Sequence, residues 1–285
     1  MIQTRVRRKR MLDTKISQMI RDTVFASIIA SSAGALPTAV HAQQLNTLSP
    51  GQVTIGMEIS YPPFESWDGD KVVGFDPEFM AALGRQMKLT PSFVDTKFTG
   101  LILGLGAGHF DMVISGMFIN EGRLKQADGI PYVNTGASIL VNKDGSIMPK
   151  TEKDLCGVKV GLEQGTLYVV NLKKLSSEYC EPNGKPAVSI SEFPTAPEVS
   201  QALLSKNVEA QVELSSTAQL FVKKSNGRII VSSQELLYSQ NLGMYFKKGS
   251  KPLEDAVGEA FKVIRDNGEY AALVKKYDLS PVTDQ

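Results

Sequence analysis

Short β-rich runs alternate with segments of helical periodicity along most of this chain, and that alternation limits the folds open to it. Residues 53–57 and 91–95 are β-rich. Between them apolar residues recur at helical spacing, at Phe79, Met80, Leu83 and Met87. Strands that alternate with helices predict a sheet with helices packed against it. The sequence therefore predicts an α/β fold.

The stretch from Asp111 to Arg123 is the first candidate for a functional site. An apolar run of strand length ends at Ser115-Gly116, and open α/β sheets hold their ligands at the carboxyl ends of such strands. Arg123 follows about one turn into the next segment, and its planar guanidinium suits a carboxylate. The spacing alone is equally compatible with a surface arginine on a helix. Residues 129–132, which include Pro131, are predicted as a turn.

Residues 1–42 are typical of an export signal. Five basic residues at 5–10 form a basic start, a short apolar core follows at 23–36, and Val40-His41-Ala42 offers small residues at a cleavage site. The core is too short to span a bilayer, and no later stretch reaches about 18 unbroken apolar residues. We expect a signal peptide cleaved near Ala42 and a periplasmic protein. A retained N-terminal anchor is the alternative.

Without residues 1–42 the chain carries 24 basic and 28 acidic residues, a net charge near −4. This balance does not indicate a basic face for nucleic acid or an anionic membrane. His109 is the one histidine left, so catalytic triads and histidine metal sites lack their parts. The glycines of 100–108 fit neither a dinucleotide fingerprint nor a P-loop. We expect no cofactor, no metal and no enzymatic activity.

The sequence contains two cysteines, Cys156 and Cys180. In an exported chain an even pair is most simply one disulfide, and two free thiols are the alternative. Without nearby histidines the pair makes a poor zinc site.

A second β-α series begins at Val158 and ends near Ser232. The run 137–143 leaves the first series and 241–248 returns to it, so two crossings imply a hinge with a ligand cleft beside it. We predict a two-lobe protein in which a mixed sheet flanked by helices forms each lobe. The boundaries are 43–138 with 243–285 for lobe 1, and 139–242 for lobe 2.

Local motifs place further candidates at the ends of strands. Pro62-Pro63 makes a stiff loop, which presents Tyr61 as a wall of the site; Phe64 is either a second wall or core. Asp76, followed by Pro77, is predicted to cap a helix. Thr166 lies in a glycine turn between a strand and a helix. Such a turn is either a general anion site or a plain β-α connection.

From 45 to 281 the chain resembles the periplasmic solute-binding proteins of polar amino acid ABC importers, the extracellular solute-binding proteins of family 3. That resemblance implies the type II periplasmic binding protein fold. It also implies a small carboxylate-bearing ligand, an ABC permease in the inner membrane as partner, and a monomer. The motifs that carry it are Tyr61-Pro62-Pro63-Phe64, Gly74-Phe75-Asp76, Phe98-Thr99-Gly100-Leu101, Asp111 through Arg123 with Pro131-Tyr132, Gly161 through Thr166, and Gly268-Glu269-Tyr270 with Lys276-Tyr277-Asp278-Leu279.

The resemblance implies roles in the first lobe. Tyr61 and Phe98 would enclose the ligand between their rings. Gly116 would supply backbone groups. Arg123, with the amide of Asn120, would take the α-carboxylate.

It also implies roles for residues of the second lobe and for Glu58 of the first. The turn at Thr166 would close over the carboxylate, and Glu58 and Glu163 would read the ligand side chain. A subset of the family has a cysteine pair similar to Cys156 and Cys180.

Two positions depart from the family pattern. Phe118 stands where relatives often have Thr, and Leu214 stands where relatives place the Asp that pairs with the α-ammonium. Either Glu58 or Glu213 replaces the missing charge, or the ligand has no α-ammonium. Glu213 is one residue away and on a strand would face the opposite way. This favours a carboxylate-bearing solute, amino acid or amino-acid-like, that differs from a standard amino acid.

Three functions remain in competition. The first is the substrate-binding component of an ABC importer, which captures its solute by lobe closure. The second is an exported adaptor or sensory protein with a degenerate pocket, partnered with a periplasmic oxidoreductase. The third is a periplasmic dehydratase that uses a carboxylate as acid and base.

Overall fold

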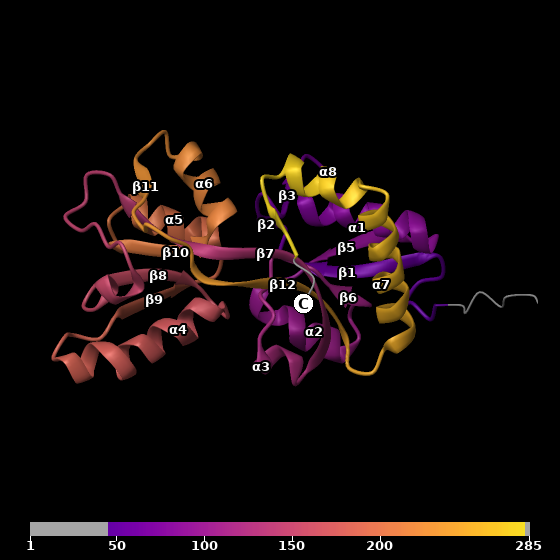
Figure 1. Cartoon of the computed structure of the whole chain (residues 1–285), viewed down its shortest axis with the longest axis horizontal. Helices are drawn as coiled ribbons and strands as arrows, with labels where there is room; N and C mark the ends of the chain where they lie inside the picture. The colour runs from indigo at the N-terminus through magenta and orange to yellow at the C-terminus, as the bar shows by residue number, and fades with distance from the viewer. Residues whose placement is uncertain (1–44, 283–285) are drawn as a thin grey trace, which may run out of the picture. The chain divides into compact units, whose positions relative to one another are not determined.

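The computed structural model describes residues 45–282 (Figure 1), and the predicted export signal lies outside them. The predicted α/β class is confirmed: a ten-stranded sheet and a three-stranded sheet are flanked by helices. No helix in this part of the chain is long and apolar enough to cross a membrane. The strands are β1 (Gln52–Met57), β2 (Ser60–Tyr61), β3 (Glu65–Asp68), β4 (Lys71–Val73), β5 (Thr90–Asp95), β6 (Met112–Val113), β7 (Ala127–Asn142), β8 (Lys159–Glu163), β9 (Ser189–Phe193), β10 (Ala210–Leu214), β11 (Ile229–Val231), β12 (Leu237–Lys247) and β13 (Ser280–Pro281).

The α-helices lie between these strands and after them. They are α1 (Phe75–Met87), α2 (Leu101–Ala107), α3 (Glu121–Leu124), α4 (Leu167–Leu175), α5 (Ala196–Leu204), α6 (Ser215–Lys224), α7 (Lys251–Asp266) and α8 (Glu269–Lys276). Four shorter helical segments complete the described chain: η1 (Phe98–Gly100), η2 (Glu152–Leu155), η3 (Ser176–Cys180) and η4 (Glu181–Asn183).

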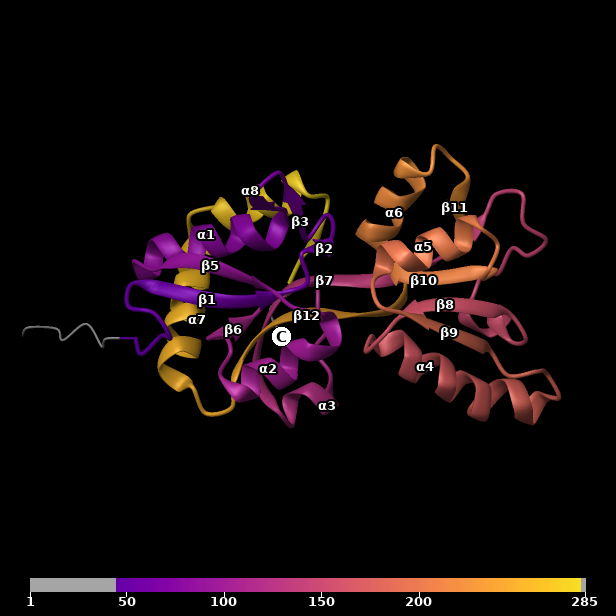
Figure 2. The same cartoon turned by 180° about the vertical axis from the view of Figure 1, so that it is seen from behind.

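The large sheet joins the two lobes instead of forming two separate sheets. Its order is β5-β1-β6-β12-β7-β10-β8-β9. The outer strands are parallel within each lobe: β1 with β5 and β6, and β8 with β9 and β10. At the centre β12 and β7 run antiparallel to each other and pass between the lobes (Figures 1 and 2). Two long strands therefore form the connection that the sequence predicts as two crossings.

Strand β7 changes partners along its length. Residues 127–135 pair with β12, whereas Ala137–Val141 pairs with β10. The β7–β12 register shifts between Leu237 and Gln240, close to this exchange of partners. A register shift bends a strand locally, so the ladder has an irregular point where the lobes meet.

The prediction of a turn at residues 129–132 is wrong, because these residues lie inside β7. Pro131 has no N–H for the ladder and is normally excluded from a central strand. Here the register shifts again, so that Leu242 faces Val133 while Gly243 faces Pro131. This irregularity accommodates the proline within the strand.

The first lobe has an aromatic core in which rings from α1, β7, α7 and α8 meet. Phe79 stacks on Tyr132 and meets Phe261 edge-on, at centroid distances of 5.6 and 5.3 Å. The hydroxyl of Tyr270 donates to the Tyr132 carbonyl at 2.7 Å. These contacts fix β7 against the two C-terminal helices.

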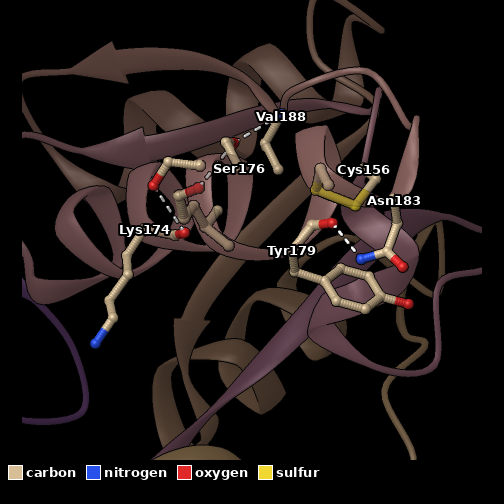
Figure 3. Close-up of a disulfide and its surroundings, with 9 residues drawn as sticks. Cys156, Lys174, Ser176, Tyr179, Asn183 and Val188 are labelled. Atoms are coloured by element: carbon tan, nitrogen blue, oxygen red, sulfur yellow. Dashed lines mark hydrogen bonds between the residues drawn. A yellow bond between two sulfur atoms is a disulfide. The ribbon is translucent and has the colours of Figure 1, made fainter.

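The second lobe contains the predicted disulfide, which is confirmed between Cys156 and Cys180 (Figure 3). It joins the residue after η2 to the end of η3, and the two cysteines are 24 positions apart in the sequence. Nearby, the Ser176 hydroxyl donates to the Leu172 carbonyl and accepts from the Val188 N–H, at 2.9 and 3.0 Å. The bridge and these hydrogen bonds secure the irregular segment that follows α4.

Candidate functional site

Three acidic side chains lie at the carboxyl ends of strands that meet at one edge of the sheet. Glu58 follows β1, Glu163 ends β8, and Glu213 is the penultimate residue of β10. Strands β8 and β10 are parallel neighbours with Gln211 opposite Gly161. Two residues further on, this register places Glu213 beside Glu163. Parallel strands bring their carboxyl ends to a common edge, and here that edge is acidic.

Glu58 reaches the second lobe through Glu163. The two carboxyl groups lie within hydrogen-bonding reach of each other, and the N–H of Phe98 also faces Glu58. One oxygen of each, Oε1, accepts from no donor in the described structure. Two acidic groups from different lobes thus meet with part of their hydrogen-bonding capacity unused.

Tyr61 and Glu213 form a second contact between the lobes. The Tyr61 hydroxyl donates to Glu213 Oε1, which also accepts from the Leu214 N–H at 2.8 Å. The other oxygen of Glu213 accepts from Gln211 Nε2 at 3.2 Å, and the Gln211 side chain accepts in turn from Ser200 at 2.9 Å. A chain of side chains from α5 therefore holds this carboxyl group toward the first lobe.

The expectation that Glu213 faces away from the site is wrong. It rests on strict alternation along a strand, but every residue of β10 is buried, so neither face of the strand is a solvent face. Because Glu213 lies at the strand's end, its side chain reaches past the sheet edge to Tyr61. The sequence did contain a signal for this residue: Glu213 lies near the end of one strand, and Glu163 ends the neighbouring strand.

Glu58, Glu163 and Glu213, defined here as the cleft acids, are buried without a cation in contact. They are 3, 4 and 3% exposed. No ion pair in the described residues joins a Lys, Arg or His to them, and Lys97 acts on Glu58 and Glu163 only through longer-range attraction. Burial raises the pKa of all three groups, that of Glu213 to about 7, and the neighbouring Glu58 further raises the pKa of Glu163.

Arg123 forms a third contact between the lobes. Its Nη1 donates to the Phe118 carbonyl at 2.7 Å and its Nη2 to the Gly165 carbonyl at 3.1 Å. The guanidinium also lies 5.3 Å from the centre of the Phe98 ring. These two hydrogen bonds and a further one to the Tyr245 hydroxyl leave some of its five N–H groups free for an acid group. The side chain therefore points between the lobes and not into bulk water.

Two further predicted site residues of the first lobe, Asn120 and Gly116, help to position Arg123 and Tyr61 through contacts that involve the backbone. Asn120 is the N-cap of α3, with Oδ1 accepting from the Arg123 N–H at 2.9 Å. Gly116 has φ +51°, and an added Cβ would lie 2.9 Å from the Tyr61 ring. The Gly116 N–H already donates to Asp76 Oδ2 at 3.1 Å, so this N–H is not available to a ligand.

The two departures from the family pattern are both buried. Phe118 is 4% exposed and meets the Tyr168 ring edge-on at 6.1 Å; Leu214 is 1% exposed at the end of β10. Thr166 is the N-cap of α4, and its hydroxyl donates to the Glu163 carbonyl at 2.7 Å. That bond fixes the turn carrying Gly165, whose carbonyl Arg123 contacts.

The predicted cap of α1 is wrong. The helix begins at Phe75 with Gly74 as its N-cap, and Asp76 is its second residue. The Asp76 side chain is fully buried and turns away from the helix end, toward Gly116 and the Tyr132 hydroxyl, which donates at 3.1 Å. Tertiary contacts have replaced the local capping role that the sequence pattern suggested.

Comparison with known proteins identifies the family of this chain. The model of the bacterial extracellular solute-binding proteins, family 3, matches residues 53–280, and the chain belongs to this family. The L-cystine-binding protein TcyJ of Escherichia coli K12 is 31% identical over 236 residues, which cover 82% of this chain and 85% of TcyJ.

Solved structures agree with that assignment. An ancestral arginine-binding protein bound to arginine has a TM-score of 0.73 and 29% identity, covering 80% of this chain and 98% of its own. The ancestral amino acid-binding protein AncCDT-1, a precursor of cyclohexadienyl dehydratase, has a TM-score of 0.69 and 29% identity, covering 80% and 95%. A solute-binding role for amino acids follows from the family and from these relatives.

Proposed function

We propose that this protein is the substrate-binding component of an ABC importer, acting outside the inner membrane, and that its solute is an amino acid with a cationic side chain. The observation that carries the proposal is the set of cleft acids, buried together without a cation in contact. Burying an ionised carboxylate without a partner is strongly unfavourable. A cationic group between the lobes would remove that penalty.

Arg123 supports recognition of the other end of such a solute. Its guanidinium lies between the lobes on the side of Phe98 and Gly165, where its free N–H groups suit a carboxylate. Glu213, and not the Asp found in relatives, would then pair with the α-ammonium. Glu58 and Glu163 would take the side-chain cation. This assignment replaces the expectation of a solute that lacks an α-ammonium.

Burial of the site supports capture by lobe closure. Tyr61, Glu58, Glu163 and Glu213 are all less than a tenth exposed, so a solute reaches them only when the lobes separate. Interactions available only after closure would favour the closed state. The irregular register at the meeting of β7 and β12 supports a bend at that point.

Calorimetry on the chain from residue 43, unfolded and refolded to remove bound solute, tests the proposal. We expect L-arginine or L-lysine to bind with a Kd of about 10 µM or lower, and L-glutamate at least 30-fold more weakly. Arg123→Ala removes the carboxylate contact and abolishes binding, while the exposed Arg85→Ala is the matched control. Tighter binding of L-glutamate than of either cation would overturn the cationic assignment.

An adaptor with a degenerate pocket is the second candidate, because Phe118 and Leu214 are both buried beside the site. It predicts that none of the common amino acids binds, in either the direct titration or small-angle scattering. A decrease in the scattering radius with L-arginine excludes it. We propose no catalytic role, and the absence of prephenate turnover is the expected result for the dehydratase alternative.

A further inference from the structure

Beneath the proposed site, a second pair of acids is sealed inside the first lobe. Glu65 begins β3 and Asp76 lies in the first turn of α1, and both are 0% exposed. Their carboxyl groups lie within hydrogen-bonding reach of each other. In the described residues no ion pair joins a cation to either one. We define Glu65 and Asp76 as the inner acids.

Each inner acid contacts a residue that leads to the ligand site. Glu65 Oε1 accepts from the Ser115 hydroxyl at 2.6 Å, and Ser115 Oγ accepts from the Glu58 N–H at 3.0 Å. Asp76 Oδ2 accepts from the Gly116 N–H at 3.1 Å, and Gly116 packs against the Tyr61 ring. The inner acids thus help to position the backbone of Glu58, through Ser115, and Gly116, which packs against the Tyr61 ring.

The hydrogen-bond pattern of the inner acids requires a proton. The remaining oxygens, Glu65 Oε2 and Asp76 Oδ1, accept from no donor. Two ionised carboxyl groups in contact offer only acceptors, so they repel and cannot hydrogen-bond to each other. One bound proton converts the contact into a hydrogen bond and leaves a single negative charge, which the Ser115 and Tyr132 hydroxyls and the Gly116 N–H stabilise.

We infer that Glu65 and Asp76 share one proton at neutral pH and act as positioning residues that set Glu58 and Gly116 for ligand binding. The other titratable groups facing the pair are Tyr132, from β7, and Glu58, after β1. Neither supplies a positive charge. The inference deepens the proposed function, but the proton can be tested without any ligand.

The sign of the proton's effect on stability follows from burial. Burial raises the pKa of Glu65, and it raises the pKa of Asp76 to about 7. The folded chain therefore holds a proton that the unfolded chain releases near pH 4. The stabilisation is complete below that pH and is lost as the pH rises through the raised pKa values of the pair, first that of Asp76 at about 7 and then that of Glu65.

Urea denaturation from pH 5 to pH 7 counts this proton. One extra proton in the folded state makes the folded-to-unfolded ratio fall about tenfold per pH unit. In Glu65→Gln the amide donates to an ionised Asp76, so we expect the fall to be less steep by about tenfold per pH unit. The exposed Glu259→Gln is the matched control and should retain the wild-type slope. Equal slopes in wild type and Glu65→Gln would overturn the shared proton.

Two further readouts test positioning. In wild type the amide nitrogen resonance of Gly116 should shift with pH, with a midpoint near the Asp76 pKa of about 7, and in Glu65→Gln it should not. Ser115→Ala should bind L-arginine roughly tenfold more weakly, because it removes the link between Glu65 and Glu58. Glu65→Gln should retain more affinity than Glu65→Ala. A Gly116 resonance that ignores pH in wild type would overturn the positioning role, whether or not L-arginine binds.

Discussion

The inner acids and the cleft acids are both buried groups of carboxyl side chains, but they differ in the hydrogen-bond donors that the protein supplies to them. The inner acids receive two hydroxyls and a backbone N–H, and one proton makes their contact favourable. The donors to the cleft acids gather on Glu213, which accepts from three groups, whereas one oxygen of both Glu58 and Glu163 accepts from none. Within one lobe, we infer that a shared proton completes the contact between the buried acids; between the lobes, we propose that a cationic ligand does so.

The disulfide provides the largest expected effect and serves as a reference for this comparison, because it lies apart from both acid groups. Replacing Cys156 and Cys180 with Ala opens a loop closed by two cysteines that are 24 positions apart. We expect a loss of roughly 3 kcal/mol in the free energy of unfolding. Urea denaturation should show the same loss at pH 5 and at pH 8. A loss that depends on pH would mean that the bridge influences the acids after all.

Asp76→Ala should destabilise the protein by about 2 kcal/mol, since it leaves the buried Gly116 N–H without an acceptor and removes the partner of Glu65. Urea denaturation at pH 6 measures the loss. Asp76→Asn is the matched control, because its carbonyl oxygen can still accept from Gly116 and its amide can donate to Glu65. If both variants lose the same stability, the inner acids matter only for their volume.

Glu163→Gln should have the opposite effect on stability. At pH 8 the folded protein must either ionise this buried acid beside Glu58 or bind a proton that the unfolded chain has released, so we expect unliganded stability to rise by roughly 1 kcal/mol when the acid is removed. Affinity for L-arginine should fall about tenfold, because the side-chain cation loses a partner. Thermal unfolding and calorimetry report the two effects separately. Glu192→Gln, an exposed acid on the neighbouring strand β9, should change neither.

The smallest expected effect is a rise in the affinity for L-arginine with pH. Glu213, with a pKa raised to about 7 by burial, binds a cation only in its ionised form. Between pH 6 and pH 8 the expected increase is about threefold to tenfold, within the limit for one proton. Titrations at three pH values check the increase, and Glu213→Gln should flatten it. If the affinity for L-arginine instead falls between pH 6 and pH 8, the ligand group beside Glu213 is not a cation.

The sequence was sufficient where local chemistry decides the structure. Helix α4 begins directly after Thr166, where the glycine turn predicts a helix, and the paired cysteines form the expected bridge. Arg123 follows from the strand-to-helix pattern after Ser115-Gly116, and the structure directs it between the lobes. These features depend on periodicity and on residue type within a short stretch.

The sequence failed where distant segments decide the role of a side chain. Asp76 has the pattern of a helix cap, but Gly116 and Tyr132 compete for its carboxylate from other elements. Glu213 was placed by alternation, which turns it to the face opposite Leu214, but both faces of β10 are buried and Glu213 still reaches Tyr61 from the end of the strand. Pro131 predicts a turn until the register shift with β12 is known. Each failure reflects a partner more than 30 positions away in the chain.

The place of β12 in the sheet has a consequence for the order in which the chain can fold. This strand, residues 237–247, lies between β6 and β7, although both are made more than 90 residues earlier. During synthesis from the N-terminus the middle of the sheet is therefore vacant until the chain is nearly finished. The two halves of the ladder close around their last strand, so a nascent chain stopped short of residue 237 has no continuous sheet.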